Sequence, residues 1–383
     1  MENQARIRRA QSCATDAREA VREFHAAVTQ PDTALVMFFC SSEYDLDALA
    51  DEMAHLFAGV QVVGCTTAGE IGPAGCSDHS ISGVSFPAGS FAVATGLIDR
   101  LQGFEMAQAP SLVQGLLQRL EALKPGSDED NTFAFLLIDG LSVREEPVTS
   151  ALQEALGGLP LVGGSAGDGL NFGSTHVYFD GAFRADSAVL TLISTALPFK
   201  IFKTQHFVPT ERRVVVTRAD AEHRIVMELD GWPAAEEYSR LAGTGLEGLD
   251  PMRFATSPVV VVIDGTNYVR SIQKANPDGS LTFFCAIEEG IVLRVACGKD
   301  LEENLKQALV ELETAVGPPQ LVLGCDCILR RLEIIHSGLV DRVGAMMRAS
   351  NVVGFNSYGE QYHGVHVNQT LTGVAIGYGP TDG

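Results

Sequence analysis

Three short apolar runs along the chain have the length and composition of buried strands. They are TALVMFFC from Thr33, TFAFLLIDG from Thr132 and PQLVLGC from Pro319. Continuous apolar runs of this length are typical of strands covered on both faces, as in parallel sheets. We therefore expect buried strands near residues 33–40, 132–139 and 320–324.

Each run is followed by a segment in which apolar residues recur every three or four positions. The three apolar stripes are Leu46, Leu49, Met53 and Leu56; Val148, Leu152 and Leu156; and Val340, Val343, Met346 and Met347. This spacing predicts amphipathic helices that pack one face on a sheet. These apolar positions are therefore core residues rather than cofactor contacts.

A glycine-containing motif comes after each predicted helix. Its copies are VVGCTTAGEI from Val62, LVGGSAGDG from Leu161 and VVGFNSYGEQ from Val352. Each motif lies roughly thirty residues after its apolar run, the size of a β-α-β crossover between parallel strands. HSISGVSF from His79 and NQTLTGVAIG from Asn368 add a similar strand after the first and third copies. The chain is thus expected to be an α/β protein built from duplicated β-α-β units.

The stretch between the second and third copies has a different pattern. Short strand candidates such as RRVVVTRAD, PVVVVIDG and GIVLRVACG alternate with tight turns such as ANPDG, ahead of a predicted helix from about Leu301 to Val316. This indicates a mixed or antiparallel C-terminal portion. The expected division is an N-terminal helical segment at 1–32, one domain at 33–229 and a second at 230–383, with the boundary near Asp230.

Composition narrows the function classes. The formal charge of −21 gives the chain no general electrostatic reason to bind nucleic acid, and no local Lys/Arg cluster reverses this. No apolar run reaches the ~18 residues that a membrane span needs. The charged N-terminus lacks the apolar core of a signal peptide. We therefore expect a cytoplasmic protein without a membrane span, whose eight cysteines are mostly buried and reduced.

The motif loops offer the first candidate chemistry. In open α/β sheets, ligands bind where loops leave the C-terminal ends of strands. Glu70 and Glu360 could hold an ammonium group or cap neighbouring backbone amides, and Thr66, Thr67 and Ser357 could hold a carboxylate.

A second motif suggests a hydrolase. The G-x-S-x-G stretch around Ser165 resembles a nucleophile elbow, but that motif needs a helix directly after the serine. The sequence that follows Ser165 has a loop and strand pattern instead. The other two motif loops have no serine at the corresponding place. Hydrolysis through Ser165 is therefore kept only as a third alternative.

Several separated motifs together resemble one family. VVGCTTAGEI, LVGGSAGDGLNF, the V-x-R-A-D…ELDGWPAAEEY stretch and VVGFNSYGEQ occur in the order seen in the FIST domain family, with its N-terminal and C-terminal portions. The resemblance extends from about Thr33 to Gly377. It implies a bacterial intracellular sensory module that binds a small ligand and works with signal-transduction partners.

A freestanding chain of this kind is similar to the NosP group of nitric-oxide-sensing FIST proteins. That similarity implies non-covalent binding of haem b, nitric oxide as the signal and a sensor histidine kinase as the regulated partner. No step of such sensing needs catalysis, so we expect no enzymatic activity. A homodimer is the candidate assembly. The alternative from another class is a haem-free FIST module that binds a small ligand such as an amino acid.

Haem would need an axial ligand, and the candidates are His363 and His366, with His206 in reserve and Tyr362 as a neighbouring ligand or hydrogen-bond donor. Three-residue spacing places both rings on one side of a helical turn, whereas an extended segment turns them to opposite sides. The strand pattern after His366 favours the extended form. A single iron ligand is then expected from this pair, with the other ring facing solvent or a supporting partner.

Overall fold

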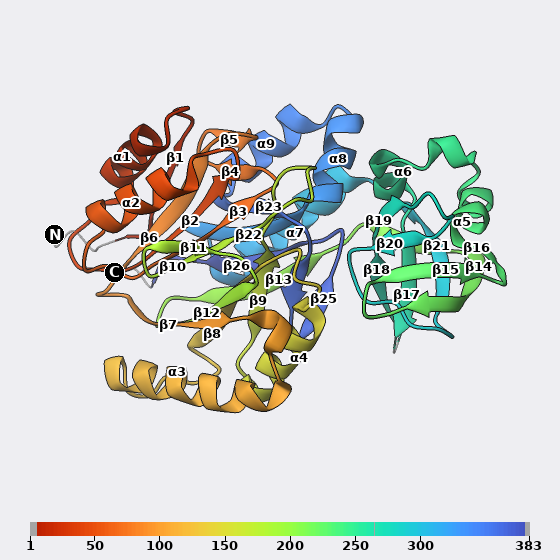
Figure 1. Cartoon of the computed structure of the whole chain (residues 1–383). Coiled ribbons are helices and arrows are strands. Elements are labelled where there is room, and N and C mark those ends of the chain that lie inside the picture. Colours follow the sequence, from red (N-terminus) through yellow and green to blue (C-terminus); the bar gives the residue numbers. More distant parts are fainter. Residues whose placement is uncertain (1–5, 264, 380–383) are drawn as a thin grey trace.

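The computed structural model describes residues 6–263 and 265–379, which form three six-stranded sheets and one eight-stranded sheet that curls into a barrel (Figure 1). Two parallel strands lie at the centre of each six-stranded sheet. The three sheets pack around a common apolar core, and helices cover their outer faces. The α/β class predicted from the sequence is confirmed.

The first sheet shows the arrangement of one repeat. Its strand order is β1 (Arg8–Ser12), β6 (Ile81–Pro87), β2 (Thr33–Ser41), β3 (Val62–Thr67), β10 (Val177–Phe179) and β11 (Ala182–Arg184). The pair β2–β3 is parallel, and β6 runs antiparallel to β2. The strands from β1 to β3 in this order belong to the first repeat, whereas the hairpin β10–β11 comes from the following repeat.

The other two sheets repeat this order. The second sheet consists of β7 (Phe91–Asp99), β12 (Ser187–Thr195), β8 (Thr132–Ile138), β9 (Leu161–Ser165), β24 (Glu360–Tyr362) and β25 (Val365–Val367). The third consists of β13 (Phe199–Thr204), β26 (Leu371–Ile376), β22 (Leu321–Cys327), β23 (Val352–Ser357), β4 (Glu70–Gly72) and β5 (Gly75–Ser77). The unit therefore occurs three times, once for each copy of the glycine motif in the sequence.

The short hairpins exchange partners in a cycle. The hairpin β4–β5 leaves the first sheet and pairs with β23 of the third, whose own hairpin β24–β25 pairs with β9 of the second. The hairpin β10–β11 completes the cycle on β3 of the first sheet. Each motif loop thus crosses from one sheet to the next, and all three loops meet at the same end of the molecule.

Amphipathic helices cover the outer faces of the sheets, as the apolar stripes predicted. The first sheet carries α1 (Ala17–Val28) and α2 (Leu46–Leu56), the second α3 (Ala109–Leu123) and α4 (Glu145–Leu156), and the third α7 (Leu301–Val316), α8 (Ile328–His336) and α9 (Val340–Ala349). The inner faces meet in the central core, where Phe39 of the first sheet stacks on Phe355 of the third at 4.6 Å between ring centroids.

A barrel is inserted between β13 and α7 of the third repeat. Its strands are β14 (Phe207–Asp220), β15 (Ile225–Leu229), β16 (Trp232–Pro233), β17 (Val259–Ile263), β18 (Thr266–Arg270), β19 (Ile272–Ala275), β20 (Leu281–Phe283) and β21 (Val292–Gly298), with helices α5 (Ala234–Ala242) and α6 (Pro251–Thr256). Its strand pairings are antiparallel, as predicted. The end strands β18 and β19 are separated by Ser271 alone, so the sheet curls round on itself.

The predicted strands at 33–40, 132–139 and 320–324 and the helix at 301–316 are confirmed. The N-terminal segment, expected to be helical, contains β1 as well as α1, because the backbone of residues 8–12 pairs antiparallel with β6 at the edge of the first sheet. The boundary placed near Asp230 falls inside the barrel, between β15 and β16. Among the described residues, no helix combines the length and apolar character that a membrane crossing requires.

Candidate functional site

The C-terminal ends of β2, β3 and β9 surround an open cavity of about 290 Å³. Its walls come from the loops after these strands and from one face of α8. The lining residues are Ser41, Ser42, Glu43, Thr67, Ala68, Asp78, Asp168, Gly169, Leu170, Asn171, Ile328, Arg331, Leu332 and Ile335. This is the end of an α/β sheet at which ligands usually bind.

Arg331 of α8 is the central charged group of this cavity. Its Nη1 donates to the carbonyl of Ala68 at 3.2 Å and to Oδ1 of Asn356 at 3.0 Å. Its Nη2 pairs with the carboxylate of Asp78, whose side chain is 86% exposed, whereas that of Arg331 is only 12% exposed. The guanidinium is therefore fixed by the motif loops, while its counter-ion stands in water.

The motif glycine Gly69 makes room for this guanidinium. A Cβ atom at position 69 would lie 1.5 Å from Nη1 of Arg331, and the backbone there has φ +138°. A larger residue would both clash with Arg331 and strain the backbone. One of the repeated glycines thus serves the placement of a charged side chain at the strand ends.

A second cavity of about 210 Å³ lies on the other side of Arg331 and shares Asp78, Arg331 and Ile335 with the first. One wall is polar, with Cys76, Asp326 and Asn356; the other is apolar, with Ile334, Val340, Val343 and Met347. The carboxylate of Asp326 accepts a hydrogen bond from Nε of the fully buried Arg330 at 2.6 Å. Burial raises the pKa of Asp326, and Arg330 opposes that rise.

The other acids near the first cavity differ in how far they are occupied. Asp168 accepts hydrogen bonds from the amides of Phe172, Gly173 and Ser174 at 2.7–2.9 Å and from the Tyr358 hydroxyl, so it shapes its own loop. Glu43 is largely exposed and lies 3.3 Å from the His79 ring. Arg331 is consequently the charged group that the cavity holds in a rigid position.

Of the two alternatives for Glu70 and Glu360, the contacts match the capping of neighbouring groups rather than an ammonium site. Oε2 of Glu70 accepts from the amide and hydroxyl of Ser80 at 2.9 and 2.8 Å, and its Oε1 accepts from Thr67 at 2.5 Å. Glu360 makes the matching bonds to Thr370 and Ser357. Both carboxyls are fully buried and line neither cavity beside Arg331. Burial raises the pKa of Glu70 to about 7 and that of Glu360 to about 8.

The hydroxyl residues proposed for a carboxylate are also mostly occupied. Oγ1 of Thr66 accepts from the His176 amide at 3.0 Å, and the Ser357 hydroxyl donates to Glu360 at 2.6 Å. Thr67 donates to Glu70 but also lines the first cavity. Ser165 is buried at the end of β9, accepts from Nε2 of Gln361 at 2.9 Å and is followed by a loop rather than a helix. A nucleophile elbow is therefore not formed there.

His363 and His366 lie on the hairpin β24–β25 and face different surroundings, although the segment is a tight turn rather than the continuous extended strand that we expected. His363 occupies the turn between β24 and β25 with φ +46° and is exposed, its ring edge-on to Tyr362. His366 is buried, and its Nε2 lies 3.3 Å from the carbonyl of Phe284. Burial lowers the pKa of His366 to about 4, so this imidazole is neutral near pH 7.

The two other haem candidates lie elsewhere. Nε2 of His206 is 2.9 Å from both carboxylate oxygens of Glu333, and its Nδ1 is 3.4 Å from Arg330. Tyr362 borders a separate polar cleft of about 410 Å³ along β13 and α7, with the Lys203 ammonium 5.5 Å from its ring. The structure thus brings Tyr362 and His363 together but separates both from His206.

These residues do not fit a haem in this arrangement. An axial imidazole needs open, apolar space in front of one ring nitrogen for the iron and the flat porphyrin. At His366 both nitrogens face protein atoms, namely the Phe284 carbonyl and the Gln361 amide. His206 is held by Glu333, and the exposed His363 stands beside a cleft lined by lysine and amide side chains.

Two family models match the chain. The FIST N domain matches residues 34–232, more than half of the sequence, and the FIST C domain matches residues 234–363. The chain belongs to the FIST family. FIST domains are signal-transduction sensor domains. No curated protein matched the chain.

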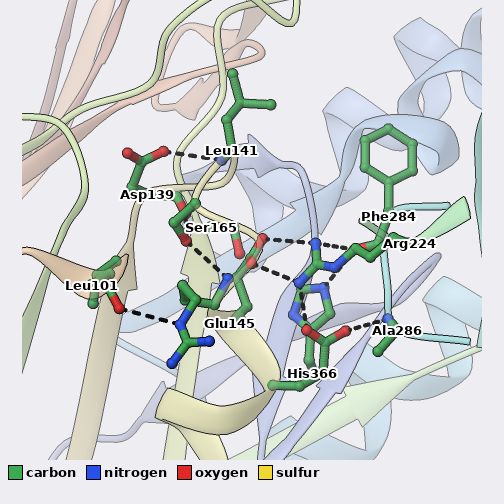
Figure 2. A network of polar contacts seen from close by, with 12 residues as sticks. Leu101, Asp139, Leu141, Glu145, Ser165, Arg224, Phe284, Ala286 and His366 are labelled. Carbon is green, nitrogen blue, oxygen red and sulfur yellow. Dashed lines mark hydrogen bonds and ion pairs between the residues drawn. The ribbon is translucent and has the colours of Figure 1, made fainter. Parts of the chain in front are cut away.

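The junction between the two FIST regions lies inside the barrel, and a buried ion cluster holds that barrel to the second repeat. Figure 2 shows Arg224 of the barrel beside Glu145, with His366, Phe284 and Ala286 around them. Arg224 pairs with Glu145 at 2.7 Å and also with Glu146, which accepts from the Ala286 amide at 2.7 Å. Burial raises the pKa of Glu145 to about 7 despite this pairing.

Sequence reasoning missed Arg331, Asp78 and Asp326. Arg331 belongs to an Arg-Arg pair just after the third buried strand, in CDCILRRLE. Charged residues directly after a buried strand are a usable signal, since that position lies at the ligand-binding end of an α/β sheet. The two arginines nevertheless point to different places: Arg330 is buried against Asp326, and Arg331 faces both cavities.

Proposed function

We propose that this FIST protein is a sensory module that detects a small organic anion in the cavities beside Arg331. The proposal rests on the hydrogen bonds and the ion pair of the Arg331 guanidinium. Its Nη1 is anchored to the motif loops by Ala68 and Asn356, whereas its Nη2 pairs with the exposed Asp78. A carboxylate that enters the cavity can replace Asp78 on a donor that is already oriented.

The exchange of counter-ions is energetically reasonable. An ion pair with one exposed partner contributes about 0–1 kcal/mol, because water competes for the exposed charge. A ligand carboxylate that is partly shielded by the cavity walls forms a stronger charge-assisted bond with the same guanidinium. Asp78 then acts as a weak internal competitor that keeps the buried arginine neutralised until a ligand arrives.

Helix α8 contacts both the cavities and the start of the barrel, so it can transmit ligand binding to the barrel. Arg331 faces the cavities, while Arg330 and Glu333 on the same helix contact His206, at the point where the chain enters the barrel. Ile328 and Leu329 of α8 also share an apolar cluster with Ala255 of α6. A shift of α8 on ligand binding therefore acts on the root of the barrel, where a partner protein can sense it.

The test is thermal unfolding in the presence of acetate, the smallest carboxylate with a methyl group. At a hundred times its Kd, acetate should stabilise the wild type by about 2.7 kcal/mol and raise Tm by about 3 °C. Arg331→Gln should abolish the shift. Arg342→Gln, which removes an exposed arginine paired with Glu302, is the matched control and should keep it. An equal shift in both variants refutes the site.

The finer functions implied by the resemblance remain predictions. These are haem b, nitric oxide, a partner histidine kinase, a homodimer and the absence of enzymatic activity. The amino-acid alternative needs another carboxylate for the ammonium group, because Glu70 and Glu360 are occupied; Glu43 at the rim and the displaced Asp78 are the acids that could serve. A Soret band in protein purified from iron-supplied cells, lost in His363→Ala, His366→Ala or His206→Ala, would support the haem prediction.

A further inference from the structure

The second cavity beside Arg331 has an apolar wall that the anion site alone does not explain. Ile334, Val343 and Met347 are buried along this wall, and Ile335 and Val340 at its edge are 49% and 43% exposed. Exposed large apolar side chains around a cavity mark a surface that is completed by an apolar partner. The wall faces the same guanidinium that we assign to the anion.

The charges around the cavity are already balanced in pairs. Asp326 is neutralised by Arg330, and Arg331 is neutralised by Asp78. A monocarboxylate takes the place of Asp78 on Arg331, and the displaced Asp78 side chain, which is 86% exposed, remains hydrated. An additional ammonium group could then pair only with this hydrated Asp78, because the buried Asp326 is already paired with Arg330, so its lost hydration would be replaced only in part.

The geometry points to a short aliphatic monocarboxylate as the ligand. Its carboxylate takes the place of Asp78 on Nη2 of Arg331, and its hydrocarbon chain lies against Ile334, Val343 and Met347. This inference rests on the proposed anion site, which accounts for the carboxylate, and it adds the hydrocarbon chain of the ligand. The same chemistry with an added amino group, as in leucine, is the competing outcome.

The chain-length dependence of binding tests the apolar wall. Isothermal titration with acetate, butyrate and isocaproate should give affinities that rise about fourfold for each methylene group that becomes buried. Leucine, which has a similar branched chain with an ammonium group, should bind at least about tenfold more weakly than isocaproate. Isoamylamine, with the chain but no carboxylate, should not bind.

Two variants with matched controls separate the parts of the site. Val343→Phe should fill the cavity and remove the gain of isocaproate over acetate, whereas Val310→Phe, at a 50% exposed position of α7, should not. Asp78→Asn changes an exposed side chain and leaves the fold intact. It should strengthen the binding of every carboxylate about two- to fivefold. Asp51→Asn, at another exposed aspartate paired with an arginine, should have no effect.

The outcomes distinguish this inference from the proposed function. If acetate binds through Arg331 but affinity does not rise with chain length, or if leucine binds more tightly than isocaproate, the inference fails and the anion site stands. If Asp78→Asn weakens binding, the exchange of counter-ions is wrong. If none of the three carboxylates acetate, butyrate and isocaproate stabilises the wild type, while Arg331→Gln still unfolds cooperatively, the proposed function fails as well.

Discussion

The hairpins β4–β5 and β24–β25 occupy equivalent places in the repeat but end in opposite surroundings. Cys76 pairs across the first hairpin with Ile71, and His366 pairs across the second with Gln361. Cys76 borders an open cavity, whereas His366 is buried beneath the barrel. The fold thus repeats the same hairpin and leaves β4–β5 accessible to solvent while it buries β24–β25.

The barrel explains the difference. The amide of Ser271 approaches Oδ1 of Asn368, Arg270 donates to the carbonyl of His366, and Phe284 contributes the carbonyl beside the His366 ring. At the first hairpin the place of Asn368 is taken by Asp78, which is exposed and paired with Arg331. Insertion of the barrel therefore converts one potential binding position into a domain interface.

The largest expected effect comes from disrupting the contact between the barrel and the second repeat, which buries the hairpin β24–β25. Arg224→Ala leaves Glu145 and Glu146 buried without their cation and should destabilise the chain by about 3–5 kcal/mol. Urea unfolding can follow this through Trp232, the single tryptophan, which belongs to the barrel. Arg218→Ala removes an exposed pair with Glu228 and should cost less than about 1 kcal/mol. Equal unfolding midpoints for the two variants would contradict a structural clamp at this interface.

The buried carboxyls of Glu70 and Glu360 should make the stability of the folded chain depend on pH. The folded-state pKa of Glu70 is raised from 4.5 to about 7, so between these values the folded chain retains a proton that the unfolded chain releases. Stability therefore decreases as pH rises through this window, by about 3 kcal/mol for Glu70. For Glu360 the window extends to about pH 8.

Glutamine replacements measure this contribution. Tm of Glu70→Gln and Glu360→Gln should fall less than that of the wild type between pH 5 and 8, because the amide cannot ionise. Glu313→Gln on the exposed face of α7 should follow the wild type. A wild-type Tm that rises steadily through this pH range would show that the two carboxyls are ionised in the folded chain.

A smaller loss of stability should distinguish alanine substitution at the motif glycine Gly69 from substitution at the turn glycine Gly59. Gly59 has φ +84° and open space within 4 Å of the position that a Cβ would take, whereas at Gly69 the Arg331 guanidinium occupies that space. Both alanine variants strain the backbone, but Gly69→Ala must also displace Arg331. It should cost about 2 kcal/mol more than Gly59→Ala in urea unfolding. Equal costs would mean that Arg331 moves aside freely and is not a fixed anion donor.

Much of the fold could be predicted from local patterns. The buried strand at Thr132–Ile138 and the helix at Leu301–Val316 follow from apolar runs and helical spacing, which depend on near neighbours in the chain. The cyclic exchange of hairpins could not be predicted in this way. Strands of three residues, such as Glu360–Tyr362, carry too little pattern to specify which sheet they join.

The candidate site shows the same division. The sequence correctly placed Thr67 and Glu70 at the C-terminal end of a buried strand, but it could not predict the direction of the carboxylate. That direction is fixed by Ser80, ten residues later, which offers its amide and hydroxyl to Glu70. For His363 and His366 the expected extended segment is instead a hairpin turn at His363, and the burial of His366 depends on a barrel that is distant in sequence.

Local sequence is enough to set the strands, the helices and the glycine motifs, because each depends on the periodicity and conformational preferences of adjacent residues. Which motif loop opens to solvent depends instead on contacts between distant parts of the chain. Arg330 and Arg331 are neighbours of the same type, yet one is buried against Asp326 and the other faces the cavities. Their roles follow from long-range packing of α8 against the motif loops and the barrel, which sets where desolvated charges find partners.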